Sequence, residues 1–260
     1  MNGTRILAVT FSLFVTVSTA QTQCISSRPG HPAPDSEAIM LNDQGVALIK
    51  GERYREAVEV FRRAIQCDSD YATAYNNLGI AYGFLGQRVK GMEALRQAVR
   101  IKPDYAEAHY NIGRAHSDER RYAEAVKSYQ RAIALKPDFA QAHNNLGVAY
   151  NDWGRLKKAA IAYRQAIQLK PDYAEALNNL GTTQADSGHY RESIDSFERA
   201  LTLKPKLARA RFNLGVTYLR MKDREAALAQ HRLLETFDRG LAGKLYEGIY
   251  QGKILSVINK

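Results

Sequence analysis

Asparagine recurs along this chain at an interval that would suit the binding of an extended polypeptide. Five asparagines follow one another at intervals of 34 residues, and three of them are preceded by another: Asn76, Asn77, Asn111, Asn144, Asn145, Asn178, Asn179 and Asn213. A carboxamide both donates and accepts hydrogen bonds, so it can pair with the N–H and C=O of one extended peptide unit. We expect this row to hold a peptide by its backbone, with little preference for its side chains. The alternative is that these asparagines are a common feature of the repeat and contact no ligand.

Three carboxylates recur at the same interval. They are Asp118, Asp152 and Asp186. Carboxylates in register would favour a basic ligand segment, whereas the alternative is an ordinary solvated edge. Neither row provides a nucleophile or an acid–base pair.

Signatures of catalysis and metal binding are absent from the sequence. It contains no phosphate-binding loop, no G-x-S-x-G, no H-E-x-x-H and no C-x-x-C. His109 and His116 are seven residues apart, but no third ligand accompanies them. His109 and His143 are interpreted as packing residues. We therefore predict a protein without enzymatic activity, cofactor, metal or small-molecule substrate.

Composition is that of a folded protein with a basic balance. The chain has 260 residues, 45% hydrophobic and 25% charged, which argues against a disordered chain or a polytopic membrane protein. Its net charge of +10 makes nucleic acid a partner to consider. Two cysteines, Cys24 and Cys67, are too few for a disulfide framework. Cys67 is expected to be a buried apolar residue, and a Cys24–Cys67 disulfide stays open.

The N-terminal segment has the layout of a secretory signal peptide. Arg5 precedes an apolar run from Ile6 to Val17, and small residues precede a plausible cleavage site at Ala20. The run is shorter than the roughly 20 residues that a membrane-spanning helix needs. We predict a signal peptide over residues 1–20, a proline-rich linker over 21–37, and an exported protein, periplasmic or secreted. Lipidation of Cys24 is the less favoured alternative, and membrane association is not predicted.

The spacing of small and large residues divides the rest of the chain into six copies. The copies are 38–71, 72–105, 106–139, 140–173, 174–207 and 208–241. The eighth residue of every copy is glycine, the twentieth is small, and the twenty-fourth is a large apolar residue except for His231 in the last copy. Such a pattern predicts two helices of about 13 residues that cross closely at the glycine. One hairpin cannot bury its apolar face alone, so the copies must stack.

Several local signals mark the ends of these helices. Gly86, Gly154 and Gly188 fall where first helices would end, and the aspartate that follows three of the four repeat prolines, as in Asp104, is placed to cap the next helix. Beyond residue 240, Leu241, Leu245 and Ile249 are spaced as on one face of a helix. We predict a capping helix and tail over residues 242–260.

The pattern resembles the tetratricopeptide repeat family. The motif Asn-Leu-Gly-x-x-Tyr is intact at 77–82, 145–150 and 213–218, and the resemblance covers residues 38–241. It implies an all-α fold, an α-solenoid wound as a right-handed superhelix of six helix-turn-helix repeats. It also implies that the first helices line a concave groove. Departures lie mainly in the terminal copies, as expected where a neighbour is missing.

The resemblance implies which side chains face the groove. The asparagines would lie at its fifth and sixth repeat positions and the three aspartates at its thirteenth; this ladder resembles that of O-linked N-acetylglucosamine transferase repeat domains. Phe84, Tyr110 and Phe212 also map to inward positions and are candidate anchors for a partner side chain, or they pack against each other. The groove positions of copies two to five carry five carboxylates against Arg114, a net charge of −4. This negative charge would repel the phosphates of a nucleic acid. Some members of the family bind acidic peptide C-termini through lysine and arginine in the groove, but here those positions hold asparagine or acidic residues.

These observations predict a protein–protein interaction scaffold that binds a peptide or protein segment in the groove. The alternative is an assembly factor of the cell envelope, because the layout resembles the six-repeat lipoproteins of type IV pilus assembly. A nucleic-acid-binding helical repeat is a distant alternative. Whether the protein forms a homodimer stays open.

Overall fold

The computed structural model describes residues 35–251, which form 13 α-helices and, within that range, no strand. Their bounds are Ser36–Lys50 (α1), Tyr54–Cys67 (α2), Ala72–Phe84 (α3), Arg88–Ile101 (α4), Ala106–Asp118 (α5), Tyr122–Leu135 (α6), Ala140–Asp152 (α7), Leu156–Leu169 (α8), Ala174–Asp186 (α9), Tyr190–Leu203 (α10), Ala208–Arg220 (α11), Arg224–Glu235 (α12) and Arg239–Gln251 (α13). The predicted signal peptide and Cys24 lie outside the described residues.

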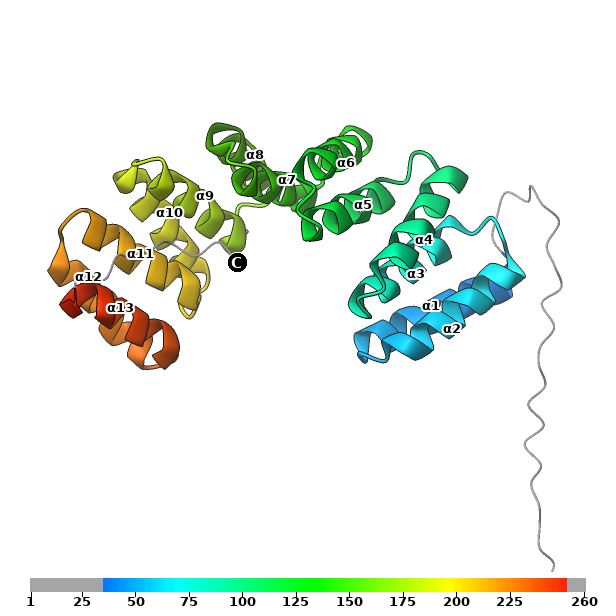
Figure 1. Cartoon of the computed structure of the whole chain (residues 1–260), viewed down its shortest axis with the longest axis horizontal. Helices are drawn as coiled ribbons and strands as arrows, with labels where there is room; N and C mark the ends of the chain where they lie inside the picture. The colour runs from blue at the N-terminus through cyan, green and yellow to red at the C-terminus, as the bar shows by residue number, and fades with distance from the viewer. Residues whose placement is uncertain (1–34, 252–260) are drawn as a thin grey trace, which may run out of the picture.

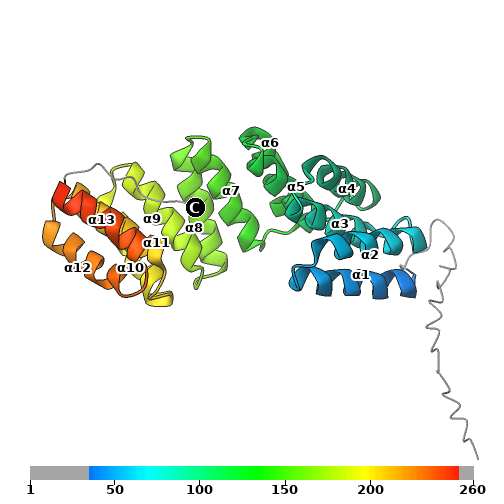
Figure 2. The ribbon, with the colours of Figure 1, turned by 60° about the horizontal axis from the view of Figure 1, so that its bottom comes forward.

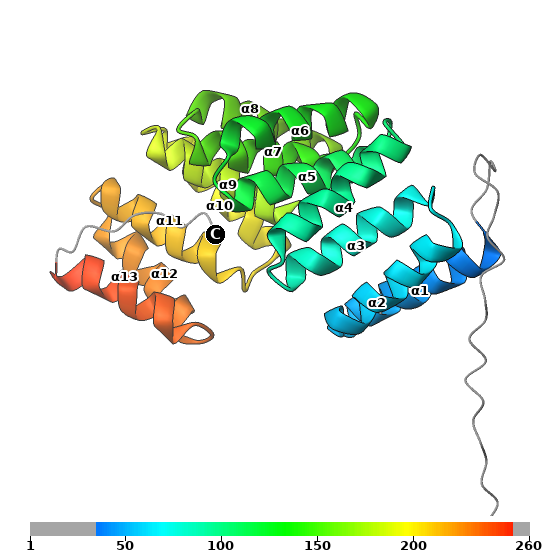
Figure 3. The ribbon, with the colours of Figure 1, turned by 45° about the vertical axis from the view of Figure 1, so that its right-hand side comes forward.

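The helices form six hairpins that stack into an arch. In Figure 1, α1 and α2 lie at one end of the arch and α12 and α13 at the other, with α5 and α7 on its inner side and α6 and α8 on its outer side. Views from below and from the right show that the hairpins are stacked in the order in which they occur along the chain (Figures 2 and 3). The predicted all-α repeat solenoid is therefore confirmed.

Each hairpin closes where a glycine of the first helix meets a large side chain of the second. A Cβ added at Gly113 would lie 2.7 Å from Tyr129 Cδ1, and Gly45, Gly147 and Gly181 meet an aromatic ring in the same way. The last copy has His231 at the large position, and there Leu245 of α13 takes the place beside Gly215. The capping helix thus supplies the packing residue that the sixth copy lacks.

The turns between paired helices require left-handed backbone. Gly86, Gly154 and Gly188 have φ of 70°, 75° and 80°, as predicted for residues that end a helix. The three other turns place a non-glycine residue at the equivalent position, with φ between 58° and 64°: Glu52, Arg120 and Lys222.

The predicted aspartate caps do not form. The N-cap of α5 is Tyr105, which makes no side-chain cap hydrogen bond, and Phe139 and Tyr173 occupy the same place before α7 and α9. Each helix begins two residues after the aspartate, so that Asp104 and its equivalents stand one residue too early to cap. By contrast, Asp35 caps α1, which starts at Ser36, before the first repeat was expected to begin.

One junction between hairpins lacks a shared apolar core. Clusters of buried apolar residues join the first two repeats, the third to the fifth, the fifth to the sixth, and the sixth to α13. Within residues 35–251, none of these clusters crosses from α4 to α5. There the third copy has His116, whereas the second, fourth and sixth have tyrosine at this position, and the second copy has Gly91 at the small position. We call this junction the α4–α5 seam.

Candidate peptide-binding groove

The first helices of the hairpins form the inner surface of the arch. Each of α3, α5, α7, α9 and α11 contacts the first helix before it, whereas no two second helices contact each other in the described part of the chain. Helices on the inside of a curved stack must lie closer together than those outside. The groove therefore lies on the first helices, as the family resemblance implied.

The asparagines of the groove are hydrogen-bonded to one another from repeat to repeat. Asn111 Nδ2 donates to Asn76 Oδ1 at 2.8 Å. The same bond joins Asn77 to Asn42, Asn179 to Asn144 and Asn213 to Asn178, at 2.8, 3.2 and 3.1 Å. Where the third repeat has tyrosine, Asn145 Nδ2 donates to the Tyr110 hydroxyl instead, at 2.9 Å. The ladder thus forms a hydrogen bond at each of the five junctions between neighbouring repeats.

Burial limits what this network can offer to a ligand. Six of the eight predicted asparagines are buried: Asn76, Asn111, Asn144, Asn178, Asn179 and Asn213. Asn77 and Asn145 are half-buried, and each uses one N–H toward the preceding repeat and accepts a bond from its own neighbour. A carboxamide has a second N–H and further lone-pair capacity. These two asparagines retain the most accessible hydrogen-bonding capacity.

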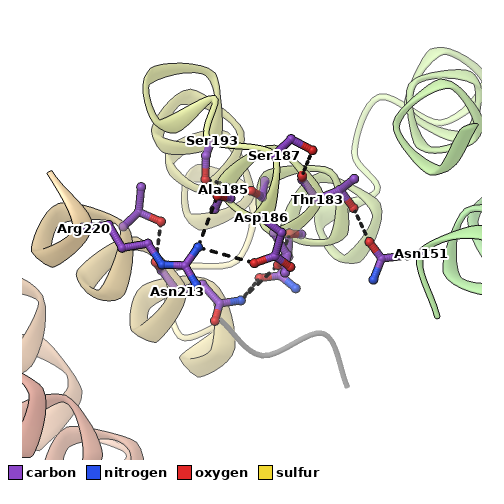
Figure 4. Close-up of polar contacts among 12 residues, drawn as sticks. Asn151, Thr183, Ala185, Asp186, Ser187, Ser193, Asn213 and Arg220 are labelled. Carbon is purple, nitrogen blue, oxygen red and sulfur yellow. Dashed lines mark hydrogen bonds and ion pairs between the residues drawn. The ribbon is translucent and has the colours of Figure 1, made fainter. Parts of the chain in front are cut away.

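Three of the five groove carboxylates are paired with cations, two of them within the same repeat and one with the following repeat. Arg220 Nη1 lies 3.4 Å from Asp186 Oδ1 and also donates to the Ala185 carbonyl, as Figure 4 shows. Lys136 pairs with Glu107 at 3.1 Å and Lys204 with Glu175. Lys136 and Lys204 lie outside the groove positions, and Arg220 stands at the thirteenth position of the last copy, which a count over copies two to five leaves out. These pairs offset much of the −4 expected from groove positions alone.

The predicted aromatic anchors occupy three different environments. Phe84 is 53% exposed and stacks on Tyr54, with ring centroids 4.6 Å apart. Tyr110 packs against Tyr129 and Phe139, and this burial raises the pKa of its hydroxyl. Phe212 is 2% exposed and belongs to the core between α11 and α13, so its expectation as an anchor was wrong. Only Phe84 presents a largely free ring.

A hollow of 780 Å³ lies beside the α4–α5 seam. Its lining includes the apolar side chains of Met92, Leu95, Tyr129 and Val148, and the polar side chains of Asn145, Asp118 and Asp152. A second hollow of 240 Å³ shares part of this lining and adds Phe84 and Asn111. Five predicted site residues therefore converge here, and the remainder lie elsewhere along the groove.

Small residues of the second repeat create this space. Gly79, Gly83 and Gly91 line it, and a Cβ added at Gly83 would meet nothing within 4 Å. At the twenty-fourth position the second repeat has Leu95, whereas the first, third, fourth and fifth repeats have an aromatic ring there. These glycines were visible in the sequence, where interior glycine signals only a weakened helix. The hollow between the second and third repeats also depends on how the two hairpins stack, which the spacing of residues within one repeat does not determine.

Charges around the hollow are balanced. Asp118, Glu119 and Asp152 are matched by Arg88, Arg114 and Arg120. A ligand that places an apolar side chain in the hollow would meet charges of both signs there. The cations were also not predicted as site residues.

Other chemically capable side chains are accounted for by packing. His109 and His143 contact the carbonyl oxygens of Pro103 and Pro137 at 3.0 and 3.1 Å. Cys67 is buried and is not a free thiol, while Cys24 lies outside the description. Residues 35–251 contain no cluster of potential metal ligands, and no helix among them is both long and apolar enough to cross a membrane.

Comparison with known sequences identifies the repeat. A family model described as tetratricopeptide repeat matches residues 78–137 and 110–174, and one described as TPR repeat matches 45–86 and 184–222. Together they span most of the described helices. Comparison with curated protein sequences gives no match.

Solved structures share the fold along most of the chain. PilW, a type IV pilus biogenesis factor, is 20% identical with a TM-score of 0.76, covering 82% of this chain and 99% of that one. PilF of Pseudomonas aeruginosa is 17% identical with a TM-score of 0.73, covering 84% and 98%. YrrB, described as a TPR protein with an unusual peptide-binding site, is 23% identical with a TM-score of 0.60, covering 73% and 99%. At these identities the likeness concerns the fold.

Proposed function

Because the chain belongs to the tetratricopeptide repeat family, we propose that it is a non-catalytic scaffold that binds a segment of another protein in its concave groove. The observation that carries this proposal is the hollow beside the α4–α5 seam, whose lining combines apolar side chains with polar and charged ones. Sites of this form bury an apolar side chain while polar groups set its orientation.

The ligand is a segment with a large apolar or aromatic side chain. That side chain would rest on Leu95 and Met92, and Phe84 would cover a neighbouring residue. Asn77 and Asn145 retain capacity to bind its backbone, whereas the buried asparagines hold the repeats together. A basic residue in the segment would be placed beside Asp118, which is exposed.

A peptide display selection tests this assignment, because the partner's identity is not needed. Gly83→Leu projects a side chain into open space at the hollow. Gly243→Leu is the matched control, since a Cβ there, in α13, also meets nothing within 4 Å. We expect the parent and Gly243→Leu to bind the selected peptides alike and Gly83→Leu to bind them at least about tenfold more weakly, a loss of ~1.4 kcal/mol.

Equal binding by all three proteins would remove the hollow from the proposed site. Circular dichroism must show the same helicity for each. Selected peptides that lack an apolar anchor would contradict the ligand class, even if Gly83→Leu weakened binding. A preference for lysine or arginine among them, lost on Asp118→Asn, would support the basic segment.

A second candidate function is assembly of an envelope structure at a membrane. It is supported by the match to PilW and PilF over nearly their whole lengths, at identities that concern the fold alone. Residues 1–20 support export, with cleavage after Ala20. N-terminal sequencing and mass spectrometry of the protein from its native host test both points. An intact Met1 would rule out cleavage, and an unmodified Cys24 would rule out a lipid anchor.

A further inference from the structure

The outer surface of the fourth repeat carries a concentration of unpaired cations. Arg155, Lys157, Lys158 and Arg164 are exposed, and α8 contains no aspartate or glutamate. Among residues 35–251, no carboxylate lies within ion-pair distance of any of these four. By contrast, Arg53 and Arg121 at equivalent turns pair with Glu56 and Glu124 at 2.6 and 3.0 Å. The positive charges of these four side chains are therefore not balanced by a carboxylate of the described residues.

Exposed apolar side chains lie among these cations. Ile161 is 59% exposed and lies between Lys157 and Arg164 at helical spacing, so the three share one face of α8. Together they line a shallow hollow of 290 Å³ whose far side includes Glu192. Trp153, 42% exposed, lies in the preceding turn, with the Arg155 guanidinium 5.3 Å from its ring. We call Trp153, Arg155, Lys157, Lys158, Ile161 and Arg164 the α8 patch.

The position of the lysines is unfavourable for the helix itself. The first turn of a helix is the positive end of its dipole and favours carboxylates. Four other second helices follow this rule, with Glu56, Glu124, Glu192 and Glu225. The first turn of α8 instead contains Lys157 and Lys158, without an acid. Like the exposure of Ile161, this arrangement reduces stability unless an anionic partner offsets it.

We propose that the α8 patch binds the surface of a bilayer that contains anionic lipid. Lysine and arginine attract anionic headgroups, while tryptophan and isoleucine can enter the boundary between headgroups and acyl chains. A nucleic acid would engage the cations but gives no reason for the exposed Ile161. An acidic protein surface would leave vesicles unbound, so the vesicle experiment separates it from the bilayer. Helix α8 lies on the outer side of the arch (Figure 1), away from the first helices, so the groove would remain open to its ligand. This inference does not depend on the function proposed for the groove.

Tryptophan fluorescence tests the proposal directly, because Trp153 is the single tryptophan of the chain. The full chain is mixed with vesicles of equal parts phosphatidylcholine and phosphatidylglycerol, and with vesicles of phosphatidylcholine alone. We expect a blue shift with the anionic vesicles and none with the neutral ones. Added salt should weaken binding, because it screens surface charges. Cosedimentation gives the affinity independently.

Matched charge reversals locate the surface. Lys157→Glu with Lys158→Glu should weaken cosedimentation at least about tenfold, since each basic residue near an anionic surface contributes about 1 kcal/mol. Lys127→Glu with Arg131→Glu makes the same charge change on exposed positions of α6 and should leave binding close to the parent. Every variant carries the same apolar N-terminal run, so a difference between them reports on α8.

Three results with vesicles would overturn the proposal. They are equal loss in both reversal variants, equal binding to neutral vesicles, and an unshifted Trp153 spectrum at saturating anionic vesicles. Binding to heparin without binding to vesicles would also overturn it and would indicate a polyanion-binding surface. Ile161→Asn tests the apolar contribution, and we expect it to weaken cosedimentation while retaining the salt dependence.

Discussion

The asparagines of the groove combine two demands on one residue type. Asn213 is fully buried and donates to both Asn178 and Thr182, while Asn77 is half-buried and faces the groove. A buried acceptor that loses its donor costs about 1–3 kcal/mol, whereas water can replace the donor where the removed side chain was half-exposed, as the Asn77 amide is beside Asn42. The same substitution should therefore have different effects along the ladder.

Asn213→Ala should lower the free energy of unfolding by about 1–3 kcal/mol, because it leaves the Asn178 carboxamide oxygen without this bond. Asn77→Ala should lower it by less than about 1 kcal/mol. Urea denaturation followed by circular dichroism measures both. Equal losses would show that burial does not decide the ladder's contribution, and would favour a purely structural role for Asn77 as well.

Three turns place a non-glycine residue in the left-handed backbone region, and the cost of this conformation can be measured at single residues. Arg120 has φ of 58° where the following copy has Gly154. Non-glycine residues in this region are disfavoured by roughly 1–2 kcal/mol. Arg120→Gly should therefore raise the unfolding free energy by about 1 kcal/mol, as measured in urea, and Gly154→Ala should lower it by a similar amount. A destabilising Arg120→Gly would mean that the side chain makes a compensating contact.

At the scale of elements, the hairpins could be predicted because each depends on residues within one 34-residue copy. The crossing of Gly113 and Tyr129, and the turn at Gly154, follow from spacing alone. The α4–α5 seam could not be predicted in this way. Its hollow arises because Gly83 and Gly91 of one copy meet Arg114 and Asp118 of the next, and their meeting depends on the angle between hairpins. The Arg220–Asp186 pair escaped prediction for the same reason.

The seam should also respond to pH through His116. Its ring is 7% exposed and its Nδ1 has no hydrogen-bond partner. Burial lowers the pKa of His116 below its ordinary 6.5, and Arg121 and Arg96 act in the same direction against Glu124 and Glu119. The unfolded chain then binds the proton more readily than the folded one. Stability should fall as pH drops below about 6.5, until the folded histidine is itself protonated.

His116→Tyr tests this sign. Tyr82 and Tyr150 show that the position accepts a phenol, and tyrosine does not titrate in this range. The variant should lose the part of the stability slope between pH 6.5 and 5 that His116 contributes, as measured by urea denaturation across that interval. It should also be more stable than the parent near pH 7, because the larger ring fills the seam. An unchanged slope would place the pH dependence elsewhere.

At the scale of the molecule, a solenoid has no central core, so each hairpin depends on its neighbours. The N-terminal end closes with α1, while the C-terminal end closes with α13. Leu245 of α13 is fully buried and fills the space beside Gly215 that His231 leaves. The sixth repeat is therefore completed from outside its own copy. The expected boundary between repeat and capping helix, at residue 242, falls inside a helix that begins at Arg239.

Leu245→Ala should accordingly destabilise one end of the molecule rather than the whole. Removal of a fully buried leucine side chain costs about 2–5 kcal/mol. Because coupling passes only between neighbours, amide hydrogen exchange should accelerate most in α11, α12 and α13, and least in α1 to α4 beyond the α4–α5 seam. Leu233→Ala is the control, since Leu233 is 46% exposed and should change exchange little. Uniform acceleration along the chain would show that the arch unfolds as one cooperative unit and that the seam does not uncouple its two sides.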